Sequence, residues 1–224
     1  MGIFNKLWLF NSLDFLEKPV KTFLENDSRA LAFGEFYFGE VNAEKNVLFV
    51  NVDYGIGLGI LIDSEMYYGK SGFSGEFGHI PFFDNEIICQ CGKKGCLETE
   101  ASGASLIRKF KEKIKQGSTS VLLKKNKSLE SLTLNDIIQA ANNEDNLCIE
   151  LLAELGENLG KALAGLINIF NPELIILGGT LSETGDYLRL PTRSAINKYS
   201  LSLVNTDTKL KISKLGEKAG ILGA

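Results

Sequence analysis

The sequence predicts an α/β domain with a mixed sheet flanked by helices. Three short apolar runs, rich in β-branched residues and separated by glycines, occupy residues 47–68. Helical patterns then alternate with two further buried strands as far as residue 215. Meandering strands followed by alternating helices and strands are typical of a mixed sheet. With 224 residues, 44% of them hydrophobic, the chain can bury a sizeable core.

A capped helix is expected before the first strand. The polar pair Asn26-Asp27 introduces a helical pattern, for which Asp27 or Ser28 is the expected N-cap. Residues 47–52 are β-branched and aromatic, as is typical of a buried strand. A glycine-rich turn at residues 55–59 is then expected to lead into two short strands, at residues 60–62 and 66–68.

The second half of the chain predicts helices that alternate with strands. Leucines recur every three or four residues from Leu147 to Leu166, which indicates one long amphipathic helix that ends at Asn171-Pro172. Cys148 lies in this helix and is expected to be an inert buried thiol. The remaining elements are expected at residues 102–115 (helix), 133–141 (helix with a Thr or Asn cap), 173–179 (strand), 187–198 (helix) and 209–215 (strand).

The composition and charge exclude several classes of function. The 24 basic and 28 acidic residues give a net charge of −4, so no direct contact with nucleic acid is expected. No stretch is apolar enough to span a membrane. The apolar opening segment is interrupted by Asp14, Glu17 and Lys18, and no small-residue cleavage site follows it. We therefore expect a soluble, cytoplasmic protein.

A cluster of cysteines predicts a metal site. Cys89, Cys91 and Cys96 lie within eight residues of sequence. His79, the only histidine of the sequence, precedes the first of them by ten residues. Three thiolates and one imidazole complete the tetrahedral shell of a zinc ion and leave no position for water, so the zinc would be structural. The alternative is a reduced thiol cluster beside a histidine that is satisfied by other contacts.

Three acidic side chains are candidates for binding a hydroxyl-rich ligand. Glu76 lies three residues before His79 and Glu98 lies two after Cys96, so a zinc ion would hold both carboxylates in place. Each alone is more often a surface glutamate, but paired beside a glycine-rich approach they indicate a polyol site. Asp27 is either a helix cap or a general base that takes a proton from an attacking hydroxyl.

The glycine-rich segment DYGIGLG, at residues 53–59, has two interpretations. Backbone N–H groups of such turns can bind phosphate. Glycine-rich hairpins are also common without any ligand, so this segment by itself identifies no function.

Together these motifs resemble the ROK family of repressors, uncharacterised reading frames and sugar kinases. The segments GEFGH and CQCGKKGCLE match the family patterns GExGH and CxCGxxGCxE, and the similarity extends from LENDSRALAFGE to the terminal AGILGA. The resemblance implies an actin-like (RNase H-like) ATPase fold in which the sugar binds between two lobes. It also implies a homo-oligomer.

The resemblance assigns roles to residues by their position in these motifs. Asp27 matches the catalytic base. The matches to sugar-hydroxyl ligands are Asn26, Asp27, Glu76, His79 and Glu98, and the matches to zinc ligands are His79, Cys89, Cys91 and Cys96. In a kinase, ATP with Mg²⁺ would contact the turn glycines Gly55 and Gly57 and the adenosine-site glycines Gly178 and Gly179.

Two departures from the family pattern bear on function. Family kinases begin with an N-terminal lobe that carries a DxGGT-type phosphate loop, whereas this chain starts just before Asn26. We therefore expect a fragment, in which residues 1–40 are the remnant of the first lobe and the crossover. Residues 41–224 would form the C-terminal actin-like domain, with a zinc-binding loop at residues 76–98. Asp53-Tyr54 also replaces the Gly-Thr pair of the second phosphate loop and places a carboxylate there.

These observations leave two main functional hypotheses. The first is the sugar-binding domain of a ROK-type transcriptional regulator, which recognises a hexose or N-acetylhexosamine through the zinc-stapled loop. The second is an ATP-dependent, glucokinase-like or N-acetylhexosamine kinase that phosphorylates the sugar 6-hydroxyl. A non-functional remnant that exposes apolar surface is a third possibility.

Overall fold

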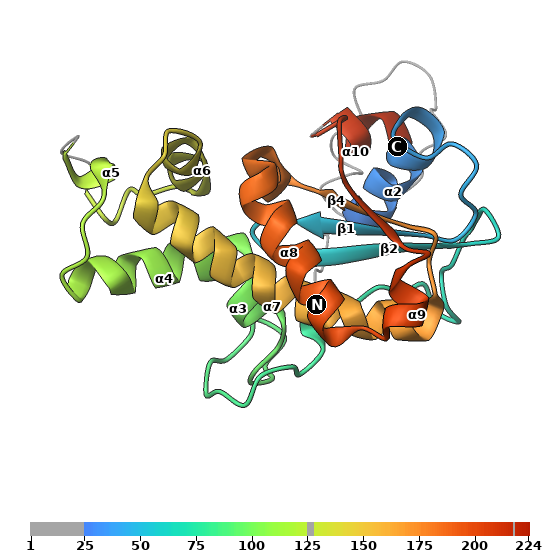
Figure 1. Cartoon of the computed structure of the whole chain (residues 1–224), viewed down its shortest axis with the longest axis horizontal. Coiled ribbons are helices and arrows are strands. Elements are labelled where there is room, and N and C mark those ends of the chain that lie inside the picture. The colour runs from blue at the N-terminus through green and yellow to red at the C-terminus, as the bar shows by residue number, and fades with distance from the viewer. Residues whose placement is uncertain (1–24, 125–127, 217) are drawn as a thin grey trace, which may run out of the picture.

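The computed structural model describes residues 25–124, 128–216 and 218–224, and these residues form the predicted mixed sheet. Within them, five strands lie in the order β3-β2-β1-β4-β5 (Figure 1). The central strand β1 (Val47–Val52) pairs antiparallel with β2 (Ile56–Ile62) and parallel with β4 (Leu174–Gly178). At the edges, β3 (Glu65–Met66) is antiparallel to β2 and β5 (Lys209–Ile212) is parallel to β4.

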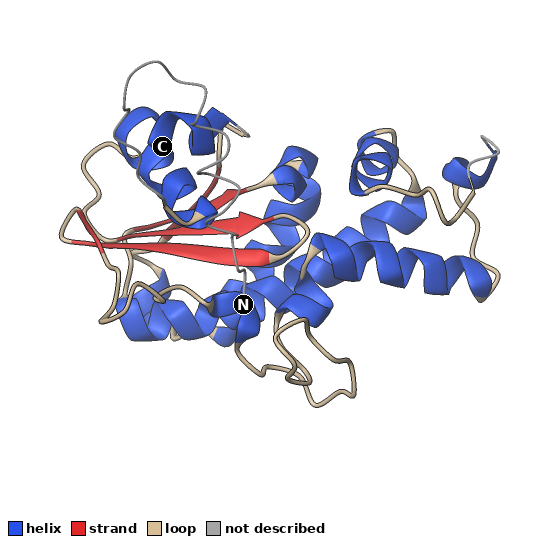
Figure 2. Cartoon of the chain, turned by 180° about the vertical axis from the view of Figure 1, so that it is seen from behind, coloured by secondary structure: helices blue, strands red, loops and turns tan. Residues whose placement is uncertain are grey.

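The helices cover both faces of this sheet. Their bounds are α2 (Asp27–Phe38), α3 (Glu98–Ala101), α4 (Gly103–Lys115), α5 (Val121–Lys124), α6 (Leu134–Asn142), α7 (Asn146–Phe170), α8 (Asp186–Tyr199), α9 (Ser202–Asn205) and α10 (Lys218–Gly223). Two short 3₁₀ helices are η1 (Phe77–His79) and η2 (Thr180–Thr184). Figure 1 shows α2 and α10 on one face and α7 and α8 on the other, and Figure 2 shows the same layers from behind.

The alternation of strand side chains creates two apolar cores. Leu48, Val50 and Val52 point into the larger core, which α7 and α8 close. Val47 and Phe49 point the opposite way, beneath α2. Because successive side chains of a strand face opposite sides of the sheet, an apolar run such as β1 must be covered on both faces.

Most predicted elements are confirmed. The first strand has the expected bounds, and Thr133 caps α6 with a reciprocal bond from Asp136. The leucine-rich helix is α7, which ends where Asn171 adopts the left-handed conformation. Cys148 is fully buried, as predicted. Within the described residues, no helix is long and apolar enough to cross a membrane.

The second strand begins earlier in the sequence than predicted. Strand β2 begins at Ile56, so Gly57 and Gly59 lie inside the strand rather than in the turn before it. A Cβ at Gly57 would collide with Ser28 Oγ, and one at Gly59 would come 2.5 Å from Ala32 Cβ. The glycines therefore allow α2 to pack directly on β2, which is a tertiary contact that local sequence does not reveal.

The ends of other elements also differ from prediction. The N-cap of α2 is Asn26, not Asp27 or Ser28, because its side chain accepts the first free N–H groups. Strand β3 ends at Met66 and β5 at Ile212, and the helix α10 follows where no further element was expected. The division at residues 40 and 41 stays a prediction, since residues 1–24 lie outside the described residues.

Candidate functional site

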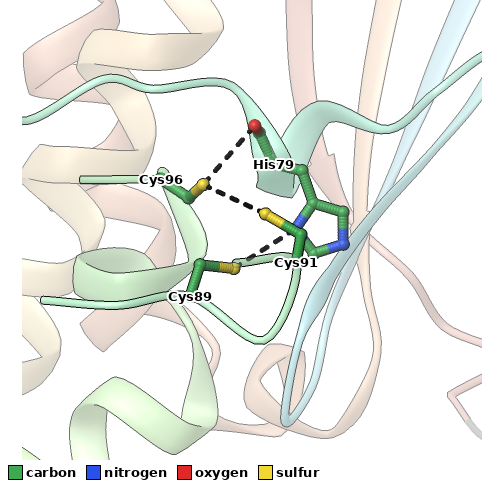
Figure 3. A group of neighbouring side chains, drawn as sticks. All are labelled: His79, Cys89, Cys91 and Cys96. Carbon is green, nitrogen blue, oxygen red and sulfur yellow. Dashed lines mark hydrogen bonds between the residues drawn. The ribbon is translucent and has the colours of Figure 1, made fainter. Parts of the chain in front are cut away.

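His79 and the three clustered cysteines come together at one point (Figure 3). Their ligand atoms all lie within 4.8 Å of one another. His79 Nδ1 is 3.4 Å from Cys89 Sγ, and Cys91 Sγ is 3.6 Å from Cys96 Sγ. Two sulfurs bound to one tetrahedral zinc ion at about 2.3 Å are separated by roughly 3.8 Å. Donor types and spacing therefore fit a four-ligand zinc site.

A tight turn gives the loop this shape. Cys89 N–H donates to Lys93 O at 2.8 Å, and Gly92 N–H donates back to Cys89 O at 2.9 Å. Gly95 has a φ of +67°, and a Cβ there would collide with Phe83 O. Only glycine adopts this conformation without strain in so close a contact. The turn therefore brings Cys96 back to the two earlier cysteines.

The three thiols are electrostatically unequal. Burial and the neighbouring Cys91 thiol raise the pKa of Cys96 to about 12, and burial also raises the pKa of Cys89. The backbone N–H of Lys93 lowers the pKa of Cys91. Because thiolates are the metal ligands, binding of an ion would release the protons of the buried thiols.

Glu98 connects the cysteine loop to the β1–β2 turn. It opens α3, two residues after Cys96. Its Oε2 accepts the Ile56 N–H at 3.0 Å, and its Oε1 lies 3.8 Å from Cys89 Sγ. A Cβ at Gly55 would come 2.6 Å from Oε2, so glycine makes room for the carboxylate.

Glu76 and His79 lie on the adjoining segment. Glu76 Oε2 is 3.9 Å from His79 Nε2, while His79 Nδ1 faces the sulfurs. The two ring nitrogens of His79 therefore point to different partners. The side chain of Glu76 is 58% exposed and is accessible to a ligand.

Asn26 and Asp27 lie at the start of α2. Asn26 Oδ1 accepts the N–H groups of Ser28 and Arg29, at 3.0 and 3.3 Å, which leaves its amide nitrogen for a ligand. Asp27 Oδ1 accepts the Ser28 N–H at 2.7 Å. The second oxygen of Asp27 has no hydrogen-bond partner among the described residues.

Arg29 attaches the segment before Glu76 to this helix. Its Nη1 donates to Gly72 O at 2.9 Å, and its guanidinium lies 5.3 Å from the centre of the Tyr68 ring. Sequence reasoning missed Arg29, which lies in the matched segment LENDSRALAFGE but was given no role there. Its contact joins residues that are 43 positions apart.

These elements enclose one open cavity of about 340 Å³. Of the predicted ligand-binding side chains, its wall includes Asn26, Asp27, Glu76 and Glu98. His79 is not among the lining residues, so its contact with a sugar stays a prediction. The wall also contains Asn51, Asp53 and Tyr54, none of which was predicted as a sugar ligand.

Asp53 makes a contact that sequence reasoning also missed. Its Oδ2 accepts the Thr180 hydroxyl at 2.7 Å, and its Oδ1 accepts its neighbour Tyr54 N–H at 2.7 Å. The contact arises because β1 and β4 are parallel neighbours whose carboxyl ends meet at one edge of the sheet. Gly179 lies at the same edge, where a Cβ would come 2.7 Å from Val52 O.

The predicted cofactor glycines therefore have packing roles. Gly55 accommodates Glu98, Gly57 lies under α2, and Gly178 pairs with Asn51 in the sheet. Their contact with a nucleotide, and that of Gly179, stays a prediction.

Comparison with known proteins shows the family to which this chain belongs. The model of the ROK family matches residues 15–224. A xylose repressor of Caldicellulosiruptor bescii is 34% identical over 201 residues, which are 90% of this chain and 50% of the repressor. A glucokinase of Halalkalibacterium halodurans is 33% identical over 213 residues, which are 94% of this chain and 64% of the glucokinase. The chain thus spans about half to two thirds of the length of these relatives.

A solved structure supports the same fold. It is a ROK family glucokinase from Streptomyces griseus in complex with glucose and AMPPNP, with a TM-score of 0.82 and 30% identity. The match covers 89% of this chain and 65% of that chain. The actin-like fold predicted from the motifs is confirmed.

Proposed function

Because the chain belongs to the ROK family, we propose that it is the sugar-binding domain of a ROK-type transcriptional regulator. It binds a hexose or an N-acetylhexosamine in the cavity beside the cysteine cluster. The observation that carries this proposal is the convergence of polar side chains from separate elements on that cavity. Asn26 and Asp27 come from α2, Glu76 from the segment before η1, and Glu98 from α3.

The chemistry of the wall suits a polyol. Sugar hydroxyls donate hydrogen bonds to carboxylates, and such charge-assisted bonds are stronger than neutral ones. The free oxygen of Asp27 and the carboxylates of Glu76 and Glu98 supply acceptors, while the amide nitrogen of Asn26 supplies a donor. In this proposal, sugar binding changes the angle between the two lobes of the regulator.

In the proposed function, the metal ion has a structural role. His79, Cys89, Cys91 and Cys96 would hold a zinc ion in a closed shell, and the ion would supply rigidity rather than an open coordination position. Glu98 follows this shell directly and touches Cys89, so its carboxylate would be held in place for the sugar.

Asp53 favours a regulator over a kinase. Its carboxylate already accepts the Thr180 hydroxyl and the Tyr54 N–H, which are donors that a phosphate would need at this edge. A fixed negative charge also repels a polyphosphate unless Mg²⁺ lies between them.

An ATP-dependent hexose or N-acetylhexosamine kinase is the second candidate function. The position of Asp27 favours it, because its free oxygen can accept the proton of the sugar 6-hydroxyl. The likeness to glucokinases supports the same candidate. Kinship with repressors and kinases is also our reason to propose a cytoplasmic homo-oligomer.

Calorimetry of the zinc-loaded chain with glucose, N-acetylglucosamine and N-acetylmannosamine tests the sugar site. We expect one of these sugars to bind and none to cause ADP release from Mg-ATP. ADP release that Asp27→Asn abolishes would establish the kinase instead. If none of the sugars binds or is turned over, the proposed sugar site is wrong.

A further inference from the structure

A second cavity, of about 290 Å³, adjoins the sugar cavity. It lies between the cysteine loop and α4. The two cavities share three lining residues, Tyr54, Gly55 and Glu98, which form a common rim. At Gly55 the Glu98 carboxylate lies in the space beside the main chain, so the rim presents this carboxylate and the exposed ring of Tyr54. A ligand that occupies both cavities would therefore cross this shared rim.

Part of the lining of the second cavity is an apolar platform formed by Tyr54, Ile87 and Ile88. Tyr54 and Ile88 are 56% and 69% exposed, and Ile87 lies beside them. Such large, exposed apolar side chains at the rim of a cavity mark a binding surface. The hydroxyls of Ser102 and Ser105 are buried and bond to each other's backbone, so they are not available to a ligand.

The charges at this cavity disfavour an anionic ligand. Arg108 donates to Glu112 and to Thr99 O, and it also lies 3.5 Å from Glu100. Glu98 adds a negative charge at the rim. The amide of Gln90, which is exposed, provides polar contacts beside the platform. An apolar face with a polar edge is the chemistry that recognises a neutral sugar ring.

The combined size also fits a ligand larger than one ring. Binding cavities for small molecules typically have volumes of roughly 300–1,000 Å³. Each cavity alone lies near the lower end of that range, and the two together lie near its middle. Tyr54 is moreover the residue at which this chain departs from the Gly-Thr pair of family kinases, and the proposed function gave it no role.

We propose that the two cavities form one site for a disaccharide or other glycoside. The first ring binds Asn26, Asp27 and Glu98, and the second ring stacks on Tyr54 beside Ile88. This inference rests on the proposed sugar site and specifies the class of its ligand.

The test is calorimetry of the zinc-loaded chain with matched mono- and disaccharides. The probes are glucose against maltose and cellobiose, and N-acetylglucosamine against N,N′-diacetylchitobiose. We expect one disaccharide to bind about tenfold more tightly than its monosaccharide, as an added aromatic contact predicts. Ile88→Ala, which changes only the second cavity, should remove this gain and leave monosaccharide affinity within about twofold. Tyr54→Ala should also remove the gain, and Tyr54→Phe should keep it.

The matched control is Ile169→Ala, since Ile169 is 74% exposed and lines neither cavity. This variant should bind every probe as the unchanged chain does. Disaccharides that bind no more tightly than monosaccharides, or a gain that survives Ile88→Ala, would overturn the second subsite and leave the sugar site intact. Binding of no probe at all would instead contradict the proposed function.

Discussion

The two sides of the cavity that we propose to bind a sugar are built in different ways. On the cysteine side, Glu76 and Glu98 flank the Cys/His cluster and line the cavity, and the Glu76 side chain is 58% exposed. On the strand side, Asp53 already accepts the hydroxyl of Thr180 at the carboxyl ends of β1 and β4. The cysteine side therefore has the geometry of an ion site, and its exposed Glu76 carboxylate remains available to a ligand. The other side is satisfied by the protein's own side chains.

Of the changes on either side, loss of a metal ligand on the cysteine side should have the largest effect. Cys91→Ser should abolish binding of about one zinc per chain and lower the free energy of unfolding by on the order of 4 kcal/mol. Sugar affinity should fall with it, because Glu98 loses its support. Elemental analysis, thermal unfolding and calorimetry measure the three effects.

Cys148→Ala is the matched control for that variant, because Cys148 is a buried cysteine outside the cluster. It should keep its zinc and its sugar affinity. Cys91→Ser protein that retains a full complement of zinc would show that the four-ligand site is wrong.

Removing a charge on the cysteine side should have the next largest effect. Glu98→Gln should weaken sugar binding by about 10- to 100-fold, since a hydrogen bond to a charged group contributes about 1.5–3 kcal/mol. Calorimetry measures the change. The control is Glu86→Gln, on the same loop, where Glu86 is 87% exposed and pairs only with Lys94 among the described residues. Equal affinities of the two variants would argue against Glu98 as a sugar ligand.

A substitution on the strand side should change the binding of a nucleotide rather than that of a sugar. Asp53→Asn removes the charge that opposes a polyphosphate, so it should strengthen binding of ATP without Mg²⁺ by about fivefold, or about 1 kcal/mol. Competition against a fluorescent ATP analogue measures this change. Asp186→Asn, at the exposed start of α8, should leave ATP affinity unchanged. An unchanged affinity in Asp53→Asn would mean that this carboxylate does not oppose nucleotide binding.

The smallest expected effect is on the pH dependence of stability and comes from Glu35, a buried glutamate outside the cavity. It serves as a reference for both sides of the cavity. Glu35 on α2 is 3% exposed, accepts the Ser213 hydroxyl, and has one oxygen without a partner among the described residues. Burial raises the pKa of Glu35. The folded chain therefore favours the neutral carboxyl, and this stabilisation is lost as the pH rises through the raised pKa.

Glu35→Gln should thus flatten the decline of Tm as the pH rises above the ordinary glutamate pKa of 4.5, since glutamine stays neutral. Glu173→Gln should not, because hydrogen bonds from the Asn46 and Lys45 N–H groups lower the pKa of Glu173, and its carboxylate is stabilising above its unfolded pKa. Thermal unfolding across the pH range compares them. An unchanged slope in Glu35→Gln would show that Glu35 does not carry a buried ionisation cost.

Much of the cysteine side could be predicted from sequence, because its chemistry is local. His79 and Cys96 are 17 residues apart, and the donor types alone define a tetrahedral zinc shell. The regular leucines of α7 likewise predicted a helix, because the period of apolar residues follows from helix geometry.

The strand side could not be predicted in the same way. Asp53 and Thr180 are 127 residues apart, and only the parallel pairing of β1 with β4 brings them together. The role of Gly57 depends on where α2 packs, and the role of Arg29 depends on the position of Gly72.

The sequence by itself therefore determined the family, the order of most helices and strands, and the residues able to hold a metal. Each of these follows from residue type and short spacing. Only the tertiary structure decided that Asp53 accepts a hydrogen bond from the Thr180 hydroxyl. It also decided that Tyr54 lies on the rim shared by the two cavities. Those outcomes depend on the register of distant strands and the packing of helices, and no local pattern specifies which distant groups will meet.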